Sequence, residues 1–257
     1  MTLVARRGGV MERFEDRRAV GRLLGYQLRQ LADEHPLILA LPRGGVPVGF
    51  EVARLLRAPL YVWVVRKLGM PGNPEVGMGA VSEGGYVYLN PELVRRAGAS
   101  QHDLERQIAE KRREVEARVR LFETDQARPS LRGREVIVVD DGIATGGTVA
   151  ATLGAVRREG ARKVILAVPV AAADTLEQLE KYADQITCLA APQPLHAIGQ
   201  WYDHFEQVED EEVLALLAAA RRFAPEPEAR LTPKSARVDR APALDQFDGG
   251  EPGVQAR

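Results

Sequence analysis

The feature that most constrains this chain is a short apolar run followed at once by two carboxylates. Val136 to Val139 is β-branched and apolar, the pattern of a strand buried on both faces of a parallel sheet, and Asp140 and Asp141 follow it directly. In open α/β sheets, ligands bind at the carboxyl ends of the strands. The sequence therefore predicts that both carboxylates lie in a binding crevice.

The next residues supply an anion site. A predicted helix runs to about Arg158 and is opened by Ala144, Thr145, Gly146, Gly147 and Thr148. The first N–H groups of a helix have no intrahelical partner and lie at the positive end of its dipole, which suits a phosphate. Carboxylates accept hydrogen bonds from a diol. The pattern predicts a ligand such as a ribose 5-phosphate; a solvated acidic pair on an ordinary turn is the structural alternative.

Two common phosphate motifs do not match this stretch. A P-loop requires G-x-x-x-x-G-K-[ST], and no lysine stands in the loop before Thr148. A dinucleotide fingerprint requires G-x-G-x-x-G, with its acidic residue about 20 positions later rather than just before the loop. A nucleotide triphosphate or a dinucleotide is therefore disfavoured.

The stretch V-I-V-V-D-D-G-I-A-T-G-G-T resembles the phosphoribosyl diphosphate signature of the type I phosphoribosyltransferases. The resemblance implies an α/β fold with a central, mostly parallel sheet flanked by helices, a small hood and an inserted helical segment. It also implies that Asp140 and Asp141 hold the ribose 2- and 3-hydroxyls while Ala144 to Thr148 wraps the 5-phosphate. Ala144 matches the adenine and uracil branches, because the hypoxanthine-guanine branch has an acidic residue there.

A first cationic loop follows the expected strand Leu37 to Leu41. Glycines let backbone amides approach an anion, and an arginine adds a fork of donors. Arg43, Gly44 and Gly45 combine both and resemble the diphosphate loop of the family. A tight turn with a surface arginine is the alternative.

A second loop, Lys67 to Gly79, is rich in glycine and proline and is expected to form a mobile lid. Arg66 and Lys67 would bring positive charge to it. R-K-L-G at Arg66 and E-V-G at Glu75 resemble the lid of the adenine branch, which implies that Lys67 and Glu75 take part in catalysis and that Glu75 faces the attacking base. A solvated loop glutamate is the alternative.

The acceptor site is expected near the end of the domain, where the sequence is similar to the hood of hypoxanthine-guanine enzymes. Trp201 or Tyr202 could stack on a base, and Asp203 matches a base-contacting position. Core packing of both aromatics is the alternative. Phe14 to Arg18 is a further candidate for reaching the site, although the start of a helix explains these residues equally well.

Composition limits the remaining functions. The 35 basic and 36 acidic residues nearly cancel, so charge gives no case for nucleic acid or an anionic membrane. No apolar run approaches the ~20 residues of a membrane span. Cys188 is the only cysteine, which excludes an internal disulfide and favours a buried structural thiol in a cytoplasmic protein. Mg²⁺ is expected to arrive with phosphoribosyl diphosphate, with Asp140 and Asp141 as candidate contacts.

Strands and helices are expected to alternate, as in a parallel sheet with right-handed crossovers. The expected strands are Leu37 to Leu41, Leu60 to Val65, Ala80 to Ser82, Tyr86 to Leu89, Val136 to Val139, Lys163 to Val170 and Gln185 to Leu189. The expected helices are Arg13 to Glu34, Val46 to Leu56, two within Pro91 to Thr124, the signature helix, Asp174 to Tyr182 and Asp210 to Phe223.

Residues 13–224 are expected to form one phosphoribosyltransferase domain, with a helical insertion at 91–124 and the hood at 191–224. Residues 1–12 are expected to be a leader, with Met11 as the hypothetical natural start, and residues 225–257 are expected to be a disordered tail. An apolar stripe in the insertion should pack on the core, with a homodimer contact as the alternative. Its members are Leu104, Ile108, Val115, Val119 and Phe122.

The function expected from these parts is Mg²⁺-dependent phosphoribosyl transfer to a ring nitrogen of a nucleobase-like acceptor, as in nucleotide salvage. A regulatory domain that binds phosphoribosyl diphosphate without turnover is the alternative, because fold alone does not separate the two. The predicted lid favours the enzyme. A phosphoribosyl diphosphate synthase is disfavoured, since no separate ATP motif is present.

Overall fold

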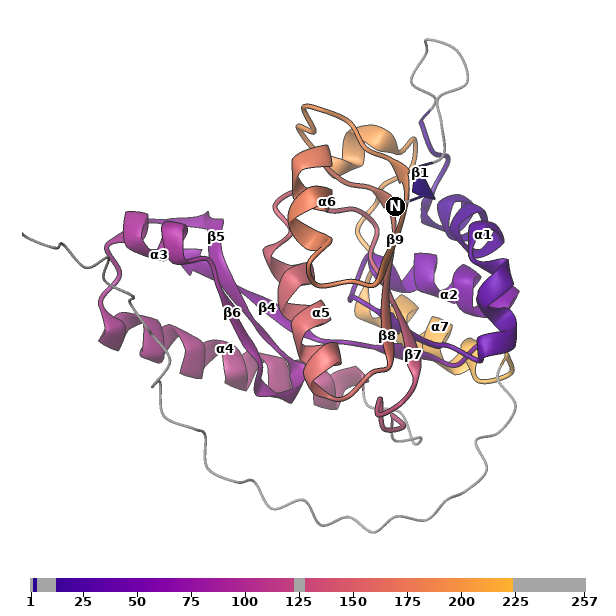
Figure 1. The fold of residues 1–257 in the computed structure, drawn as a ribbon, viewed down its shortest axis with the longest axis horizontal. Helices are drawn as coiled ribbons and strands as arrows, with labels where there is room; N and C mark the ends of the chain where they lie inside the picture. Colours follow the sequence, from indigo (N-terminus) through magenta and orange to yellow (C-terminus); the bar gives the residue numbers. More distant parts are fainter. Residues whose placement is uncertain (1, 4–12, 123–127, 224–257) are drawn as a thin grey trace, which may run out of the picture. The chain divides into compact units, whose positions relative to one another are not determined.

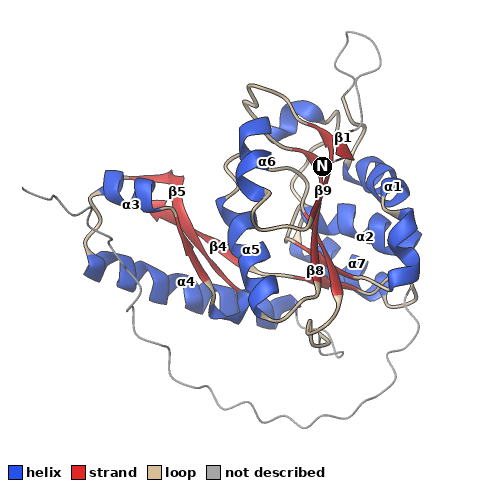
Figure 2. Cartoon of the chain, viewed as in Figure 1, coloured by secondary structure: helices blue, strands red, loops and turns tan. Residues whose placement is uncertain are grey.

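The computed structural model describes residues 2–3, 13–122 and 128–223. Its centre is a parallel sheet flanked by helices (Figures 1 and 2). The strand order of this sheet is β1-β9-β8-β7-β2-β3. The strands are β1 Thr2–Leu3, β2 Leu37–Ala40, β3 Leu60–Val62, β7 Glu135–Val139, β8 Lys163–Val170 and β9 Gln185–Ala190. The predicted α/β architecture is confirmed. The tail predicted at 225–257 and most of the leader predicted at 1–12 lie outside the described residues.

The register of the central strands positions the site. Val139, the last residue of β7, pairs with Ala40 at the end of β2 and with Ala167 on β8. The loops that follow β2 and β7 therefore begin side by side at one edge of the sheet. All five residues of β7 are buried, as expected for a strand covered on both faces.

Alternate residues of the strands face two helical layers. Ile137 and Val139 pack with α1 (Arg17–Gln27), α2 (Gly45–Leu56) and α7 (Asp210–Ala220), whereas Val136 and Val138 pack with α5 (Gly147–Arg158) and α6 (Ala173–Leu179). Successive side chains of β7 point to opposite faces of the sheet, so neighbouring residues belong to two different hydrophobic clusters.

The segment after β3 forms a second, antiparallel sheet with strand order β4-β5-β6. Its strands are β4 Val65–Met70, β5 Asn73–Ser82 and β6 Val87–Leu89, and a 3-10 turn, η2 Glu83–Gly85, joins the last two. The strand predicted from Leu60 to Val65 is confirmed only as far as Val62, where the chain leaves the parallel sheet, and Val65 begins β4. The predicted pairing of the strands on either side of Glu83 to Gly85 is confirmed.

The predicted loop from Lys67 to Gly79 is also wrong, because most of it lies in the hairpin of β4 and β5. Lys67 pairs with Ala80 and Leu68 with Gly79, and the register shifts around Gly69. The turn residue Gly72 has a positive φ, of 77°. Antiparallel pairing supplies the backbone hydrogen bonds here, so the glycines and prolines of this segment do not produce a long loop.

The first helix is shorter than the predicted Arg13 to Glu34. It starts at Arg17 because the Asp16 carboxylate caps it, accepting a hydrogen bond from the Ala19 N–H at 2.6 Å. It ends at Gln27 and continues as a 3-10 helix, η1 Arg29–Glu34. The C-terminal ends of α6 and α7, at Leu179 and Ala220, also come before the predicted Tyr182 and Phe223.

The helical insertion consists of α3 (Pro91–Ala97) and α4 (Gln101–Phe122), separated at Gly98 as predicted. Val115 and Phe122 of α4 are buried, and Leu104, Ile108 and Val119 pack against the same core cluster. Core packing of this stripe is confirmed; the homodimer stays a prediction.

The buried thiol predicted at Cys188 is confirmed, and burial raises its pKa to about 11. Within the described part of the chain, no helix combines the length and apolar character needed to cross a bilayer.

The buried indole of Trp63 connects the two sheets. Its Nε1–H donates to the Ser82 hydroxyl at 2.6 Å, and Ser82 pairs with Val65 at the start of the hairpin. Ser82→Ala should lower the free energy of unfolding by about 1–3 kcal/mol, because it leaves a buried donor without an acceptor. Denaturant unfolding measures this. Trp63→Phe should lower the free energy of unfolding less in the Ser82→Ala background than in the wild type, because the hydrogen bond is already absent. Losses that add strictly would contradict an energetic coupling between Trp63 and Ser82.

Candidate functional site

Two adjacent carboxylates occupy the edge of the sheet directly after β7. Asp141 Oδ2 accepts a hydrogen bond from Arg17 Nε at 2.8 Å, and the side chains of this pair are only 12% and 14% exposed. The Asp141 N–H donates to Asp140 Oδ1 at 2.9 Å, and the Tyr202 hydroxyl donates to the Asp141 carbonyl at 2.6 Å. The backbone and one carboxylate of the pair are therefore fixed before any ligand binds.

Burial makes negative charge unfavourable at Asp140. The pKa of its carboxyl lies well above the usual value, first because of burial and then because of the neighbouring Asp141, while Arg17 offsets part of the effect. A ligand that donates hydrogen bonds to these oxygens would favour the charged form. The site is therefore electrostatically suited to a hydroxyl-bearing ligand.

The glycines of the first predicted loop lie against the acidic pair. A methyl group on Gly44 would stand 2.0 Å from Asp141 Oδ2, and one on Gly45 would stand 2.7 Å from the Val139 carbonyl oxygen. The conformation at Gly44 is ordinary, with φ of −60°, so close approach rather than backbone freedom requires glycine there. The structure thus brings together the two loops that the sequence assigned to one ligand.

The start of α5 forms the third part of the site. Gly146 caps the helix with φ of 73°, and no side chain caps its first N–H groups. Ala144 and Thr145 are exposed, and the Thr175 hydroxyl of α6 donates to the Ala144 carbonyl at 2.8 Å. The first-turn amides at Gly147 and Thr148 have no intrahelical acceptors. The geometry suits an anion, and phosphate binding here stays a prediction.

The predicted cations differ in their surroundings. Arg43 follows a cis Pro42–Arg43 peptide bond, and its Nη1 lies 3.3 Å from Glu209 Oε2. Arg66 Nε lies 3.7 Å from a carboxylate of α4, that of Glu114. Lys67 lies on β4, with its side chain beside Gly77.

Glu75, the predicted catalytic carboxylate, lies on β5, and its side chain is outside the described residues. Its role stays a prediction.

The predicted acceptor residues separate into two groups. Tyr202 is 1% exposed and its ring stacks on Phe205 at a centroid distance of 4.8 Å, so the core-packing alternative is confirmed and a base platform at Tyr202 is wrong. Trp201 is half-buried in a 3-10 segment, η3 Ile198–Trp201, and Asp203 is exposed and pairs with Arg13 at 3.4 Å. Contacts of Trp201 and Asp203 with a base stay predictions.

The segment Phe14 to Arg18 both starts a helix and reaches the site. Asp16 caps the helix, and Arg17 donates a hydrogen bond to Asp141 of the acidic pair. Sequence reasoning missed Arg118, Glu209 and Asp210, which form ion pairs beside Arg43. Acidic residues are common at the start of a helix because the helix dipole stabilises them there. The sequence therefore gave no reason to connect the acidic start of α7 with the loop that carries Arg43.

The acidic pair suits a metal ion only as a partial ligand set. Among the described residues, no group of three or more His, Cys, Asp or Glu side chains is arranged to hold an ion. Mg²⁺ is commonly held by one or two carboxylates together with substrate phosphates and water. Asp140 and Asp141 fit an ion that arrives bound to the substrate.

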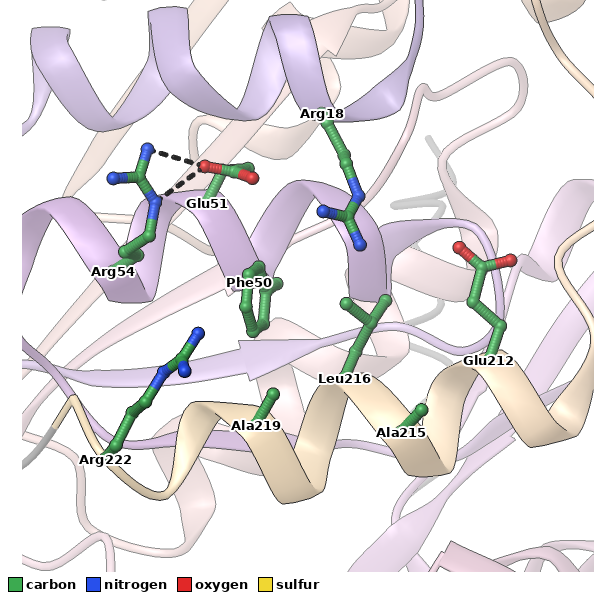
Figure 3. Close-up of a pocket in the computed structure, with 9 residues that line it drawn as sticks. All are labelled: Arg18, Phe50, Glu51, Arg54, Glu212, Ala215, Leu216, Ala219 and Arg222. Carbon is green, nitrogen blue, oxygen red and sulfur yellow. Dashed lines mark hydrogen bonds and ion pairs between the residues drawn. The ribbon is translucent and has the colours of Figure 1, made fainter.

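A separate pocket of about 520 Å³ lies between α1, α2 and α7 (Figure 3). The Glu51–Arg54 ion pair forms part of its wall, with Nη2–Oε2 at 2.8 Å. Its lining is Arg18, Phe50, Glu51, Arg54, Glu212, Ala215, Leu216, Ala219 and Arg222. Of the residues proposed to reach the ligand, it contains only Arg18, and none of the acidic pair, the glycine loop after β2 or the loop at the start of α5, so it is distinct from the site at the sheet edge.

Comparison with known proteins agrees with this geometry. Residues 12–199 match the family described as "Phosphoribosyl transferase domain". Two Mycobacterium tuberculosis proteins, named "Putative phosphoribosyl transferase Rv0571c" and "Putative phosphoribosyl transferase MT0597", are each 43% identical over 212 residues, which is 82% of this chain. The chain spans about half of the length of these relatives, 48%.

A solved structure, that of TT1426 from Thermus thermophilus, is also similar. Its sequence is 43% identical, and the two structures superimpose with a TM-score of 0.68 over 83% of this chain and 100% of that one.

The tight approach of α2 to β7 gives a stability prediction. Gly45→Ala should destabilise the fold by about 1–3 kcal/mol, because the added methyl group meets backbone atoms of Val139 and Asp140. Gly147 is the matched control, since it is likewise the first residue of its helix but has open space where a Cβ would be. Thermal unfolding should show Gly147→Ala within about 0.5 kcal/mol of the wild type. Equal losses in both variants would contradict the close approach.

Burial of Asp140 gives a second prediction. Because the folded-state pKa is raised, the stability contribution of Asp140 is full below the unfolded pKa of about 3.9 and is lost as pH rises through the folded pKa. Asp140→Asn should therefore raise the Tm of the unliganded protein at pH 8 by about 2–4 °C, corresponding to roughly 1 kcal/mol, with a smaller gain at pH 5. Calorimetry at both pH values measures this. A lower Tm of the variant at pH 8 would show that the charge stabilises the fold.

Proposed function

Because the chain belongs to the phosphoribosyl transferase domain family, we propose that it moves the 5-phosphoribosyl group from phosphoribosyl diphosphate to a ring nitrogen of a nucleobase-like acceptor. The observation that carries this proposal is the meeting of three features at one sheet edge. These are the acidic pair after β7, the glycine loop after β2 and the uncapped start of α5. On one ligand, a diol would match the acidic pair, a diphosphate would match the glycine loop, and a phosphate would match the start of α5.

In this proposal, Asp140 and Asp141 accept hydrogen bonds from the ribose 2- and 3-hydroxyls. The bond between the anomeric carbon and the diphosphate oxygen breaks, and its electron pair leaves with diphosphate. Positive charge then builds on the sugar, and fixed carboxylates near that charge stabilise the transition state. Arg17 holds Asp141 in one orientation at 2.8 Å, so little reorganisation is needed during the reaction.

The other predicted residues would act on the departing diphosphate, on the 5-phosphate and on the acceptor nitrogen. Arg43, Arg66 and Lys67 would offset the charge of the departing diphosphate, and the loop from Ala144 to Thr148 would hold the 5-phosphate. When bound with the substrate, Mg²⁺ would supply further neutralisation of the diphosphate charge. The acceptor nitrogen forms the new bond to the anomeric carbon and loses its proton, for which Glu75 is the candidate base.

A domain that binds phosphoribosyl diphosphate without turnover is the second candidate. One observation favours it, because the segment predicted as a mobile lid is a paired hairpin. A sensor requires the phosphate and ribose contacts but no cover that excludes water.

The two candidates differ in diphosphate release. The protein is incubated with phosphoribosyl diphosphate, Mg²⁺ and a panel of purines, pyrimidines and other nitrogen acceptors, and released diphosphate is measured. Release should occur with one acceptor class and should fall at least ~100-fold in the Asp140→Asn/Asp141→Asn double variant, about 2.7 kcal/mol of lost stabilisation. Glu92→Gln, on the exposed surface of α3, is the control and should retain full activity.

Binding of phosphoribosyl diphosphate, with no release of diphosphate in the presence of any acceptor, would identify the sensor. Absence of binding would contradict both candidates.

A further inference from the structure

Three arginines from distant parts of the chain meet beside the glycine loop. Arg43 follows β2, Arg66 lies on β4, and Arg118 lies on α4 of the helical insertion. They form ion pairs with two carboxylates at the start of α7 and with one carboxylate on α4. These carboxylates are Glu209, Asp210 and Glu114.

Asp210 is the centre of this cluster. Arg118 binds it with both nitrogens of its fork, Nη1 to Oδ2 at 2.7 Å and Nη2 to Oδ1 at 2.5 Å. The Nη1 atom of Arg43 lies 3.6 Å from Asp210 Oδ1 and 3.3 Å from Glu209 Oε2. The side chains of Arg118 and Asp210 are 23% and 26% exposed, so water screens their charges less than those of a surface pair. A bidentate contact with a two-oxygen anion is the geometry in which arginine also binds phosphate.

The environment of Arg66 reflects the positive charge of the other two arginines. Its pKa is lowered, first by burial and then by the charge of Arg118, with Arg43 acting in the same direction. Glu114 and Asp210 counteract this effect. Such a cluster needs anions, and a polyvalent anion could take the place of the carboxylates.

We propose that Arg118 is a third diphosphate-binding arginine, and that Asp210 occupies this anion site until diphosphate displaces it. The inference rests on the proposed function, because it adds a residue and a means of regulation to the same site. Removal of Asp210 from the arginines would free both Arg43 and Arg118 for the ligand. The insertion would then serve the site as well as the core, because α4 supplies one of the ligand-binding side chains.

The structural alternative is that the Arg118–Asp210 pair only fastens α4 to the start of α7. Asp210 is the first residue of that helix, where a carboxylate is stabilised by the helix dipole. On this alternative, the loss of Asp210 lowers stability and leaves anion affinity unchanged or weaker. On our proposal, the loss of Asp210 strengthens anion binding.

Titration calorimetry of the whole protein separates these two possibilities, with inorganic diphosphate and phosphoribosyl diphosphate as probes and Tm as a measure of folding. Asp210→Asn should lower the Kd for diphosphate about 5- to 10-fold. Glu211→Gln is the matched control, since it removes the same charge from the same helical turn and Glu211 is exposed. Its Kd should equal that of the wild type, which excludes a general effect of net charge.

Arg118→Gln tests direct contact with the anion. It should raise the Kd about 10-fold both alone and in the Asp210→Asn background. An effect seen only while Asp210 is present would show that Arg118 merely neutralises Asp210, and would overturn its assignment as a ligand. If the wild type binds diphosphate and the Kd of Asp210→Asn is unchanged or higher, the proposal that Asp210 competes with diphosphate for the arginines is wrong.

Failure of the proposed function has a different result. If the wild type and all variants bind neither probe, the phosphoribosyl diphosphate site itself is wrong, and this inference falls with it. If phosphoribosyl diphosphate binds but no acceptor causes it to release diphosphate, only the transferase is ruled out and the arginine site stays in place. Binding of diphosphate by Asp210→Asn alone would be the strongest support for displacement of Asp210.

Discussion

Two carboxylates that share one buried sheet edge set the requirements for the rest of this site. Burial, and then the charge of Asp141, raise the pKa of Asp140, and the Arg17 guanidinium donates a hydrogen bond to Asp141. The start of α2 approaches the acidic pair so closely that a side chain would not fit, which is why glycine stands at positions 44 and 45. A fold that only needed stability would not place these charges together, so their arrangement indicates a ligand that uses them.

Much of this was predictable from the sequence, for physical reasons that apply locally. A β-branched run, an acidic pair and a glycine-rich helix start define a strand, its end and an anion site within one short stretch, so β7 and α5 were found close to their true bounds. Long-range pairing was less predictable. Glycine and proline suggested a loop from Lys67 to Gly79, yet the pairing of β4 with β5 overrode those local preferences.

The residues that sequence reasoning missed are those whose partners are far away in the chain. Arg118 and Asp210 are 92 residues apart, and each looks like an ordinary charge on a helix. Tyr202 illustrates the opposite error, because an aromatic residue near a hood suggested base stacking, whereas its ring is buried and its hydroxyl supports the backbone of Asp141. Side-chain function of this kind depends on tertiary packing and cannot be read from local pattern.

The central claim is that the acidic pair recognises the diol of a ribose. Calorimetric titration of ribose 5-phosphate and of its 2,3-dideoxy analogue tests this directly, because the two ligands share the phosphate and differ only in the hydroxyls. We predict that ribose 5-phosphate binds at least ~10-fold more tightly, or about 1.4 kcal/mol, from the charge-assisted hydrogen bonds. Equal affinities would contradict the claim.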